Sequence, residues 1–282
     1  MAKEPKLDRL SPAHDTLGTR NDLCVRLART HDEIVTAQRL RYQVFYEELN
    51  AKPDFASSHS RLDADRFDEF CDHLIVVHRM AGGQFKVDGG EMVGTYRLLR
   101  QSVAEQNGGF YTQNEFDIAP LLAAKPTLKF LELGRSCVLK PHRTKPVVEL
   151  LWQGIWNYVR QHGLDVMLGC ASLDGIDQKV HASTLNFLAH NCAAPPEWRV
   201  QALPERYVEM KTDGTNVADA KVALKALPPL IKGYLRLGCY IGEGAVIDRQ
   251  FNTTDILIVL PISNINPRYF SHFGKPDETI TG

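Results

Sequence analysis

The sequence has almost no excess of charge of either sign. Its 33 Lys and Arg residues balance 34 Asp and Glu residues, which gives a formal net charge of -1 over 282 residues. Without a broad positive field we expect no nucleic-acid partner. No apolar run approaches the ~20 residues that cross a bilayer, and residues 1–8 lack the apolar segment of a secretory signal. We therefore expect a soluble cytoplasmic protein.

Motifs of metal and nucleophile chemistry are missing as well. The combinations G-x-S-x-G, S-x-x-K and H-E-x-x-H do not occur in the sequence. The cysteines follow no C-x-x-C spacing, and none is spaced with histidine as zinc ligands are. We predict no metal site, and we predict small buried thiols in a reducing compartment at Cys24, Cys71, Cys137, Cys170, Cys192 and Cys239.

The composition is that of an ordinary globular protein, with 44% hydrophobic and 24% charged residues. Residues 1–22 are polar and predict a flexible N-terminal arm. Residues 195–227 are rich in Pro, Glu, Lys and Asp and predict a long excursion from the core. The near-continuously apolar run at 254–260 predicts a late, central strand, so we predict a single domain over residues 23–282.

Hydrophobic periodicity predicts both helices and strands. A helix is expected from His31 with Asp32 as its N-cap, and the polar residues 57–60 predict a mobile loop. The strands 73–77 and 92–99 are expected to pair as an antiparallel hairpin. Together the elements predict an α+β domain with a mixed sheet. Further strands are expected at 24–28, 130–138, 166–172 and 254–260, and further helices at 144–161 and 228–237.

Acidic and basic side chains gather near the ends of these elements. Glu132 and Arg135 lie three apart in one strand, and a bulge at Gly134 would bring both to one face of the sheet. A buried structural ion pair is the simpler interpretation of that pair taken alone. Arg41 and Phe45 share one face of the first predicted helix.

Four aspartates come within ten residues, at 63, 65, 68 and 72, without the D-x-D-x-D-G spacing of a calcium loop. A solvated loop explains Asp63 and Asp65 as well as any functional role does. Asp68 and Asp72 stand at the mouth of a predicted strand and are better candidates for a site. His73 is of interest because it adjoins Asp72.

In their order along the chain, these residues resemble those of two related families. R-x-x-V-F, F-D-x-x-x-D, R-L-L and E-x-x-R look like motifs of the acyl-homoserine lactone synthases, which belong to the GNAT acyltransferase superfamily. The wider pattern is more similar to the ornithine–acyl-carrier-protein N-acyltransferases of bacterial ornithine-lipid synthesis, over most of the chain. The motifs stand at 41–45, 67–72, 97–99 and 132–135, and the wider similarity includes 71–76, 131–136, 232–238 and 251–255.

The sequence departs from the lactone synthases at two points and from typical GNAT enzymes at a third. Arg100 follows R-L-L where the lactone synthases usually have proline, and Asp68 and Asp72 are four apart where those enzymes space their acids three apart. Both departures favour the ornithine branch. The segment Lys140–Val147 is basic but lacks the glycines with which typical GNAT enzymes approach the pyrophosphate of CoA. It is suited to a single phosphopantetheine phosphate or to acidic acyl carrier protein.

The resemblance implies a GNAT-like fold, with a central, mixed, mostly antiparallel sheet flanked by helices. It implies transfer of a 3-hydroxyacyl group from acyl carrier protein to the α-amine of ornithine, which gives lyso-ornithine lipid. No cofactor is expected beyond the phosphopantetheine that the donor carries.

The resemblance also implies roles for individual residues. Glu132 would be the base, acting through water, with Arg135 and Asp68 completing the catalytic group. Arg41, Arg97 and Arg135 would grip a carboxylate or order the acids, and Asp68 and Asp72 would attract the cationic side chain. The implied substrate-binding residues are Arg41, Phe45, Asp72, His73, Arg97 and Ser136, and the donor-binding residues are Lys140, Arg143 and Lys145.

Two other functions remain open at this point. One is a long-chain N-acyl amino acid synthase with another acceptor, and the other is a non-catalytic protein that binds acyl carrier protein. The apolar segment Leu227–Leu237, with Lys232 and Arg236 interspersed, suits an interfacial helix at the inner face of the cytoplasmic membrane. Packing in the protein core is the simpler explanation of that segment.

Overall fold

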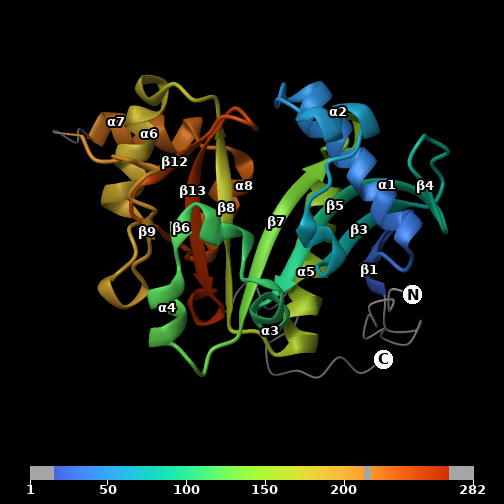
Figure 1. Cartoon of the computed structure of the whole chain (residues 1–282), viewed down its shortest axis with the longest axis horizontal. Coiled ribbons are helices and arrows are strands. Elements are labelled where there is room, and N and C mark those ends of the chain that lie inside the picture. Colours follow the sequence, from blue (N-terminus) through green and yellow to red (C-terminus); the bar gives the residue numbers. More distant parts are fainter. Residues whose placement is uncertain (1–15, 213–216, 267–282) are drawn as a thin grey trace.

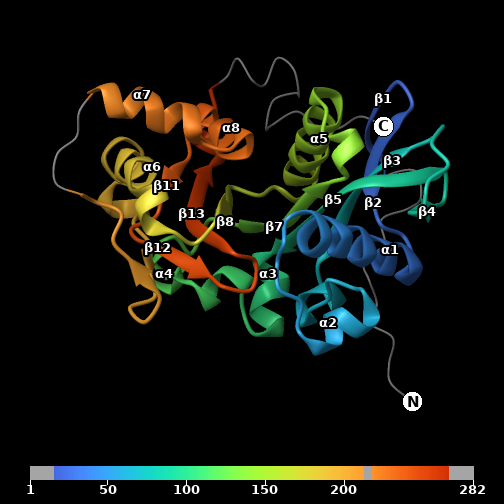
Figure 2. The same cartoon turned by 90° about the horizontal axis from the view of Figure 1, so that it is seen from above.

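The computed structural model describes residues 16–212 and 217–266, in which one large sheet carries helices on both faces (Figures 1 and 2). The sheet order is β1-β2-β3-β5-β7-β8-β13-β12-β10, with β4 beside β5 and β11 beside β13. Its strands are β1 Thr16–Arg20, β2 Leu23–Leu27, β3 Asp72–His78, β4 Lys86–Val87, β5 Gly90–Arg100, β7 Phe130–Val138, β8 Val166–Asp174, β10 Tyr207–Val208, β11 Tyr240–Ile241, β12 Ala245–Asp248 and β13 Thr253–Pro261.

All the described strand pairs are antiparallel except β7 with β8, which run parallel. A second, small sheet pairs β6 (Phe116–Asp117) with β9 (Gln201–Ala202). The predicted α+β class and the mixed, mostly antiparallel sheet are therefore confirmed. The central position predicted for β13 is confirmed too, because it lies between β8 and β12.

Helices cover the two faces of the sheet unequally. Figure 2 shows α5 and α8 on one face and α1 and α2 on the other. The helices are α1 His31–Tyr42, α2 Phe55–Ser60, α3 Gln101–Ala104, α4 Ala119–Ala124, α5 Lys145–His162, α6 Gln178–Asn191, α7 Val217–Ala226 and α8 Pro229–Leu237.

Helix α5 illustrates how local sequence and packing agree. It begins with Pro146 in its first turn and ends at Gly163, whose φ of 57° is the left-handed conformation that glycine adopts easily. Its apolar side chains, among them Leu151 and Tyr158, are buried in the largest core cluster together with Val25 of β2 and Leu74 of β3. The apolar periodicity of this segment thus places α5 across the N-terminal half of the sheet.

Three local predictions were wrong. The N-terminal arm was predicted too long: residues 16–20 form β1, which pairs with β2, while residues 1–15 lie outside the described part. The loop at 57–60 is the end of helix α2, which Asp54 caps by accepting a hydrogen bond from the Ser57 amide. The N-cap of α1 is Thr30, two residues before the predicted Asp32, and its side chain accepts a hydrogen bond from the Glu33 amide.

Four further expectations concern a membrane span, the helix at 228–237, the excursion at 195–227 and the cysteines. None of the described helices is long and apolar enough to cross a membrane. The apolar face of α8 packs in the core, where Ile231 and Tyr234 are buried. This face therefore does not support the prediction that α8 lies at a membrane interface. The excursion at 195–227 contains β9, β10 and α7. All six cysteines lie in the described ranges and are free thiols.

The parallel pair β7–β8 opens partway along its length. Register is kept from Phe130 opposite Val166 to Glu132 opposite Leu168, after which the two strands diverge (Figure 1). At the point of divergence Gly169 approaches β7 so closely that a Cβ atom would lie 2.3 Å from the Leu133 carbonyl oxygen. The opening between β7 and β8 therefore begins beside Glu132.

Replacing Gly169 with alanine should destabilise the fold by about 1–3 kcal/mol, because backbone atoms of β7 must move. The matched control is Gly134→Ala on β7, since a Cβ there meets no atom within 4 Å. Denaturant unfolding of both variants measures the difference. Equal stability of the two variants would contradict the close approach.

Candidate active site

A bulge in β7 shapes the site. Thr95 pairs with Cys137 and Arg97 with Gly134, so β7 has one residue more than β5 between these positions. The bulge predicted at Gly134 is thus confirmed in place, but the residue with positive φ is Arg135, at 49°. Such a backbone conformation is unusual for a residue other than glycine and is often found at functional sites. It turns Arg135 into the same cavity as Glu132.

Glu132 is buried and held in one orientation, with only 5% of its surface exposed. Its Oε2 accepts a hydrogen bond of 3.0 Å from the Tyr111 amide, and its Oε1 accepts one of 2.6 Å from the Thr112 amide. Burial raises the pKa of Glu132, although these hydrogen bonds act in the opposite direction. A carboxylate with a raised pKa at the end of a paired strand segment is suited to accept a proton.

The cavity that contains Glu132 has a volume of about 350 Å³ and lies where β7 and β8 part. Residues predicted for the site that line it are Phe45, Arg97, Glu132, Arg135 and Ser136. Aromatic rings enclose the Arg135 guanidinium, whose carbon lies 4.9 Å from the Tyr111 ring centre and 4.6 Å from that of Phe251.

A buried network of arginines and aspartates supports this wall. Arg41, 1% exposed, bonds Asp63 through Nε at 2.8 Å and Asp68 through Nη2 at 2.8 Å. Arg135 lies 3.3 Å from Asp63 and 3.3 Å from Asp65. A solvated loop is therefore the wrong interpretation of the first two aspartates: they hold Arg135 in place.

Asp68 lies within the network and does not line the cavity. Arg97 bonds it at 3.2 Å, and Gln38 donates a further hydrogen bond at 3.1 Å. Burial acts to raise the pKa of Asp68, but the guanidinium groups of Arg41 and Arg97 outweigh burial and hold the pKa well below its usual range. Asp68 therefore stays ionised and positions the arginines, and it does not line the cavity.

Asp72 and His73 are separated by the pleat of β3, because successive side chains point to opposite faces. Asp72 accepts a 2.5 Å hydrogen bond from the Tyr158 hydroxyl and lies 3.5 Å from Arg100, away from the arginine network. The predicted pairing of Asp72 with Asp68 around one cation is therefore wrong. His73 contacts the Asp68 carbonyl oxygen at 3.1 Å, and burial, together with nearby Arg41, lowers its pKa to about 4.

The basic residues predicted to hold the donor lie before and in the first turn of α5. Arg143 bonds Glu48 at 2.5 Å and the Val138 carbonyl oxygen at 2.9 Å, while Lys145 lies 3.5 Å from Glu149. Lys140 is in the 3-10 turn just before them, and its side chain is exposed. Arg143 is thus partly engaged within the protein, and Lys140 and Lys145 are at the surface.

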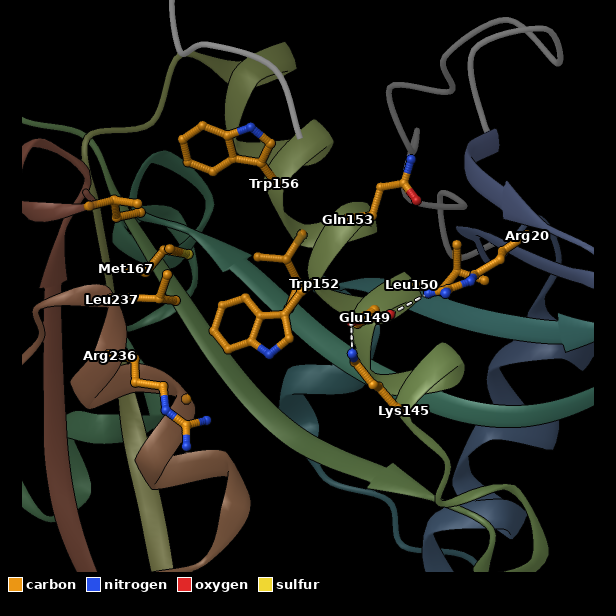
Figure 3. A pocket seen from close by; sticks show the side chains of 13 residues that line it. Arg20, Lys145, Glu149, Leu150, Trp152, Gln153, Trp156, Met167, Arg236 and Leu237 are labelled. Carbon is orange, nitrogen blue, oxygen red and sulfur yellow. Dashed lines mark hydrogen bonds and ion pairs between the residues drawn. The ribbon is translucent and has the colours of Figure 1, made fainter. Parts of the chain in front are cut away.

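A second cavity, of about 710 Å³, lies between α5 and α8 (Figure 3). Trp152 and Trp156 of α5 project into it, and Met167 of β8 lines both this cavity and the one that contains Glu132. Charged side chains stand at its edge in Figure 3, where Glu149 bonds both Arg20 and Lys145. The opening between β7 and β8 therefore brings an apolar cavity close to the buried carboxylate.

Several residues of the site escaped sequence reasoning. Tyr111 and Thr112 stand in a short 3-10 turn (Tyr111–Asn114), and no local pattern marks them as partners of Glu132. Phe251 and Asp255 lie in the segment 251–255, which resembles the ornithine family. That resemblance is the sequence feature that could have marked them as site residues. Lining residues that no prediction included are Tyr96, Tyr111, Thr112, Cys170, Asp248, Phe251, Thr253 and Asp255.

Comparison with known proteins shows the family of this chain. The acetyltransferase (GNAT) domain family matches residues 40–153, which include the end of α1 with Arg41, the aspartates that Arg41 binds and the bulged strand β7. Among solved structures, an N-acyl amino acid synthase from uncultured soil microbes is similar, with a TM-score of 0.47, 13% identity, and coverage of 86% of this chain and 91% of that chain. The chain is a GNAT-type N-acyltransferase.

The particular family follows from two closer relatives. An L-ornithine N(alpha)-acyltransferase of Agrobacterium fabrum is 48% identical over 278 residues, which cover 99% of this chain and 94% of the relative. A protein of the same name from Rhizobium meliloti is 49% identical over 264 residues, covering 94% of this chain and 88% of the relative. The chain belongs to the L-ornithine N(alpha)-acyltransferase family.

Proposed function

We propose that this enzyme transfers a 3-hydroxyacyl group from acyl carrier protein to the α-amine of ornithine, the first step of ornithine-lipid biosynthesis. The product is lyso-ornithine lipid, and the other product is the free phosphopantetheine thiol of the carrier. The observation that carries the proposal is Glu132, buried with a raised pKa in a cavity that it shares with Arg135. The names of the relatives support ornithine as the acceptor.

The reaction needs one base and good positioning, because a thioester is already activated. Glu132 removes a proton from the α-ammonium through a water molecule, and the neutral amine attacks the thioester carbonyl carbon. A C–N bond forms and the C–S bond breaks, and the leaving thiolate takes up the proton that the attacking nitrogen loses as it becomes an amide. Arg135 is proposed to bind the α-carboxylate, and this role is supported by its guanidinium, which lines the cavity.

The donor is proposed to approach through the apolar cavity of Figure 3. Trp152 and Trp156 offer apolar surface to a fatty acyl chain, and Met167 connects this cavity to the one with Glu132. Lys140 and Lys145, both exposed near the start of α5, suit an acidic carrier protein or the phosphopantetheine phosphate. A peripheral membrane contact, which the amphipathic product would favour, stays a prediction.

The test is an acylation assay with purified protein. The protein is incubated with 3-hydroxyacyl carrier protein and a panel of amino acids, and products are detected by mass. We expect acyl-ornithine as the main product, and much slower turnover when acyl-CoA replaces the carrier protein. Turnover with tyrosine but not ornithine would make the enzyme a different N-acyl amino acid synthase, and turnover with no amino acid would favour a non-catalytic carrier-binding protein.

A further inference from the structure

Three buried carboxylates meet beside the cavity that contains Glu132, and two of them, Asp248 and Asp255, line it. They are Glu115, just after the 3-10 turn that binds Glu132, Asp248 at the end of β12, and Asp255 in β13. One oxygen from each lies within 4.8 Å of the others, and their exposed fractions are only 2%, 8% and 6%. We call Glu115, Asp248 and Asp255 the acidic triad.

The protein satisfies the triad only in part, because Ser172 hydrogen-bonds Asp255 and Cys170 hydrogen-bonds Glu115 but two carboxylate oxygens are left over. Asp255 Oδ1 and Glu115 Oε2 are fully buried and have no hydrogen-bond partner among the described residues. The nearest cation to Glu115 is Arg206, at 3.8 Å and partly exposed. Asp248, by contrast, accepts hydrogen bonds of 2.8 and 2.9 Å from the amides of Gln250 and Phe251. Buried carboxylate oxygens without a partner are costly, so a cation that reached them would be bound strongly.

Like charges and burial shift the protonation of the triad. Burial first, and then the charge of Asp255, raise the pKa of Glu115 to about 7. Burial also raises the pKa of Asp255 to about 6, with Asp248 adding to the shift. Near neutral pH the empty triad therefore tends to keep a proton, which an incoming cation would displace.

The position of the triad relates it to the acceptor. Asp248, Asp255 and the unpartnered hydroxyl of Thr253 line the same cavity as Glu132 and Arg135. An amino acid whose carboxylate binds Arg135 and whose α-amine faces Glu132 must send its side chain elsewhere in that cavity. Asp248 and Asp255 lie in the same small space, and their carboxylates carry the opposite charge to an ammonium group.

We propose that the acidic triad binds the side-chain ammonium of the acceptor amino acid, a step that rests on the proposed acylation of ornithine. Three N–H donors of a primary ammonium match three carboxylate oxygens close together. The residue with the largest role is Asp255, because its Oδ1 is unpartnered and it lines the cavity. The triad thereby selects a diamino acid over a neutral amino acid of similar length.

The experiment compares Asp255→Asn with the wild type, using ornithine and norvaline as acceptors for 3-hydroxyacyl carrier protein. Norvaline keeps the α-amine and the carbon chain but lacks the terminal ammonium. The variant should lose about 10²-fold in kcat/KM for ornithine, mainly through KM, and should change little for norvaline. Glu115→Gln should shift the ratio in the same direction. Asp117→Asn is the matched control, since Asp117 is exposed on neighbouring β6.

A binding measurement without turnover complements the kinetics. Ornithine should raise the thermal midpoint of the wild type and not that of Asp255→Asn, and norvaline should raise neither. The variant itself should be at least as stable as the wild type near pH 8, because it removes a buried like charge. A protein that acylates ornithine but keeps its ornithine-to-norvaline ratio in Asp255→Asn overturns the triad proposal alone. Wild-type protein that acylates no ornithine overturns the proposed function instead.

The triad also has the composition of a weak divalent-cation site. Calcium or magnesium ions that raise the thermal midpoint of the wild type but not of Asp255→Asn, together with loss of the ornithine preference in EDTA, would replace the ammonium proposal by a metal site. Retention of the ornithine preference in EDTA supports direct binding of the ammonium, because EDTA removes the Mg²⁺ or Ca²⁺ that a metal site would need.

Discussion

Glu132→Gln should lower kcat by about 10²–10⁴-fold, the usual contribution of a general base. The change removes the proton acceptor but keeps the size of the side chain. One of the two backbone hydrogen bonds, from Tyr111 or Thr112, can still end on the amide oxygen of Gln. Single-turnover acylation of ornithine measures the effect on chemistry apart from product release.

A matched control separates this loss from a fold defect. Glu69→Gln makes the same chemical change at an exposed position in a 3-10 turn, and it should leave kcat unaltered. Glu132→Gln should unfold at a temperature close to the wild type, since burial already disfavours the charged form. If the purified variant retains more than a tenth of wild-type kcat, Glu132 is not the base.

The pH profile gives a second reading of the same group. A base must be unprotonated, so wild-type kcat should fall as pH drops through the raised pKa of Glu132. That acidic limb should be missing from the residual activity of Glu132→Gln. An identical limb in both proteins would assign it to another group.

Arg41→Ala should destabilise the protein by about 3–5 kcal/mol, because it removes the nearest counter-charge of two buried carboxylates. Arg41 is the cation that Asp63 and Asp68 share, and all three side chains are at most 5% exposed. Equilibrium unfolding in urea measures the loss. The matched control is Arg39→Ala, which removes an exposed arginine from the same helix and should cost less than 1 kcal/mol.

Acid titration tests the electrostatic origin of this effect. Asp68 has a lowered pKa in the folded protein, so its contribution to stability is present above the unfolded pKa of ~3.9 and is lost as pH falls towards the folded value. The wild type should therefore lose stability steeply below about pH 4, and Arg41→Ala should lose less there. Parallel pH curves for the two proteins would show that Arg41 acts through packing alone.

Sequence patterns predicted the parts of the fold that depend on neighbouring residues. The apolar face of α5, its glycine stop at Gly163 and the strands β3, β5 and β13 all follow from periodicity and turn chemistry within a few residues. The motif order also indicated the acyltransferase family, and Glu132 and Arg135 line one cavity as the shared-face argument required.

The errors have a common physical origin. Asp68 and Asp72 look equivalent in the sequence, but a 3-10 turn points the first into the arginine network and the strand pleat turns the second towards Tyr158. Asp63 looks like a loop residue until Arg41 and Arg135 are seen to enclose it. The partner of a buried charge depends on which elements pack together, and no local pattern states this.

The sequence by itself determined the class of the fold and the family, and it singled out Glu132 as the candidate base, because periodicity and motif order can be read along the chain. Only the tertiary structure decided which residue of the bulge has the left-handed conformation and which aspartates form ion pairs with the arginines. It also decided that Glu115, Asp248 and Asp255 lie together. Strand order and register bring these three together from distant parts of the chain, and desolvation then gives their carboxylates the strength to select a cation.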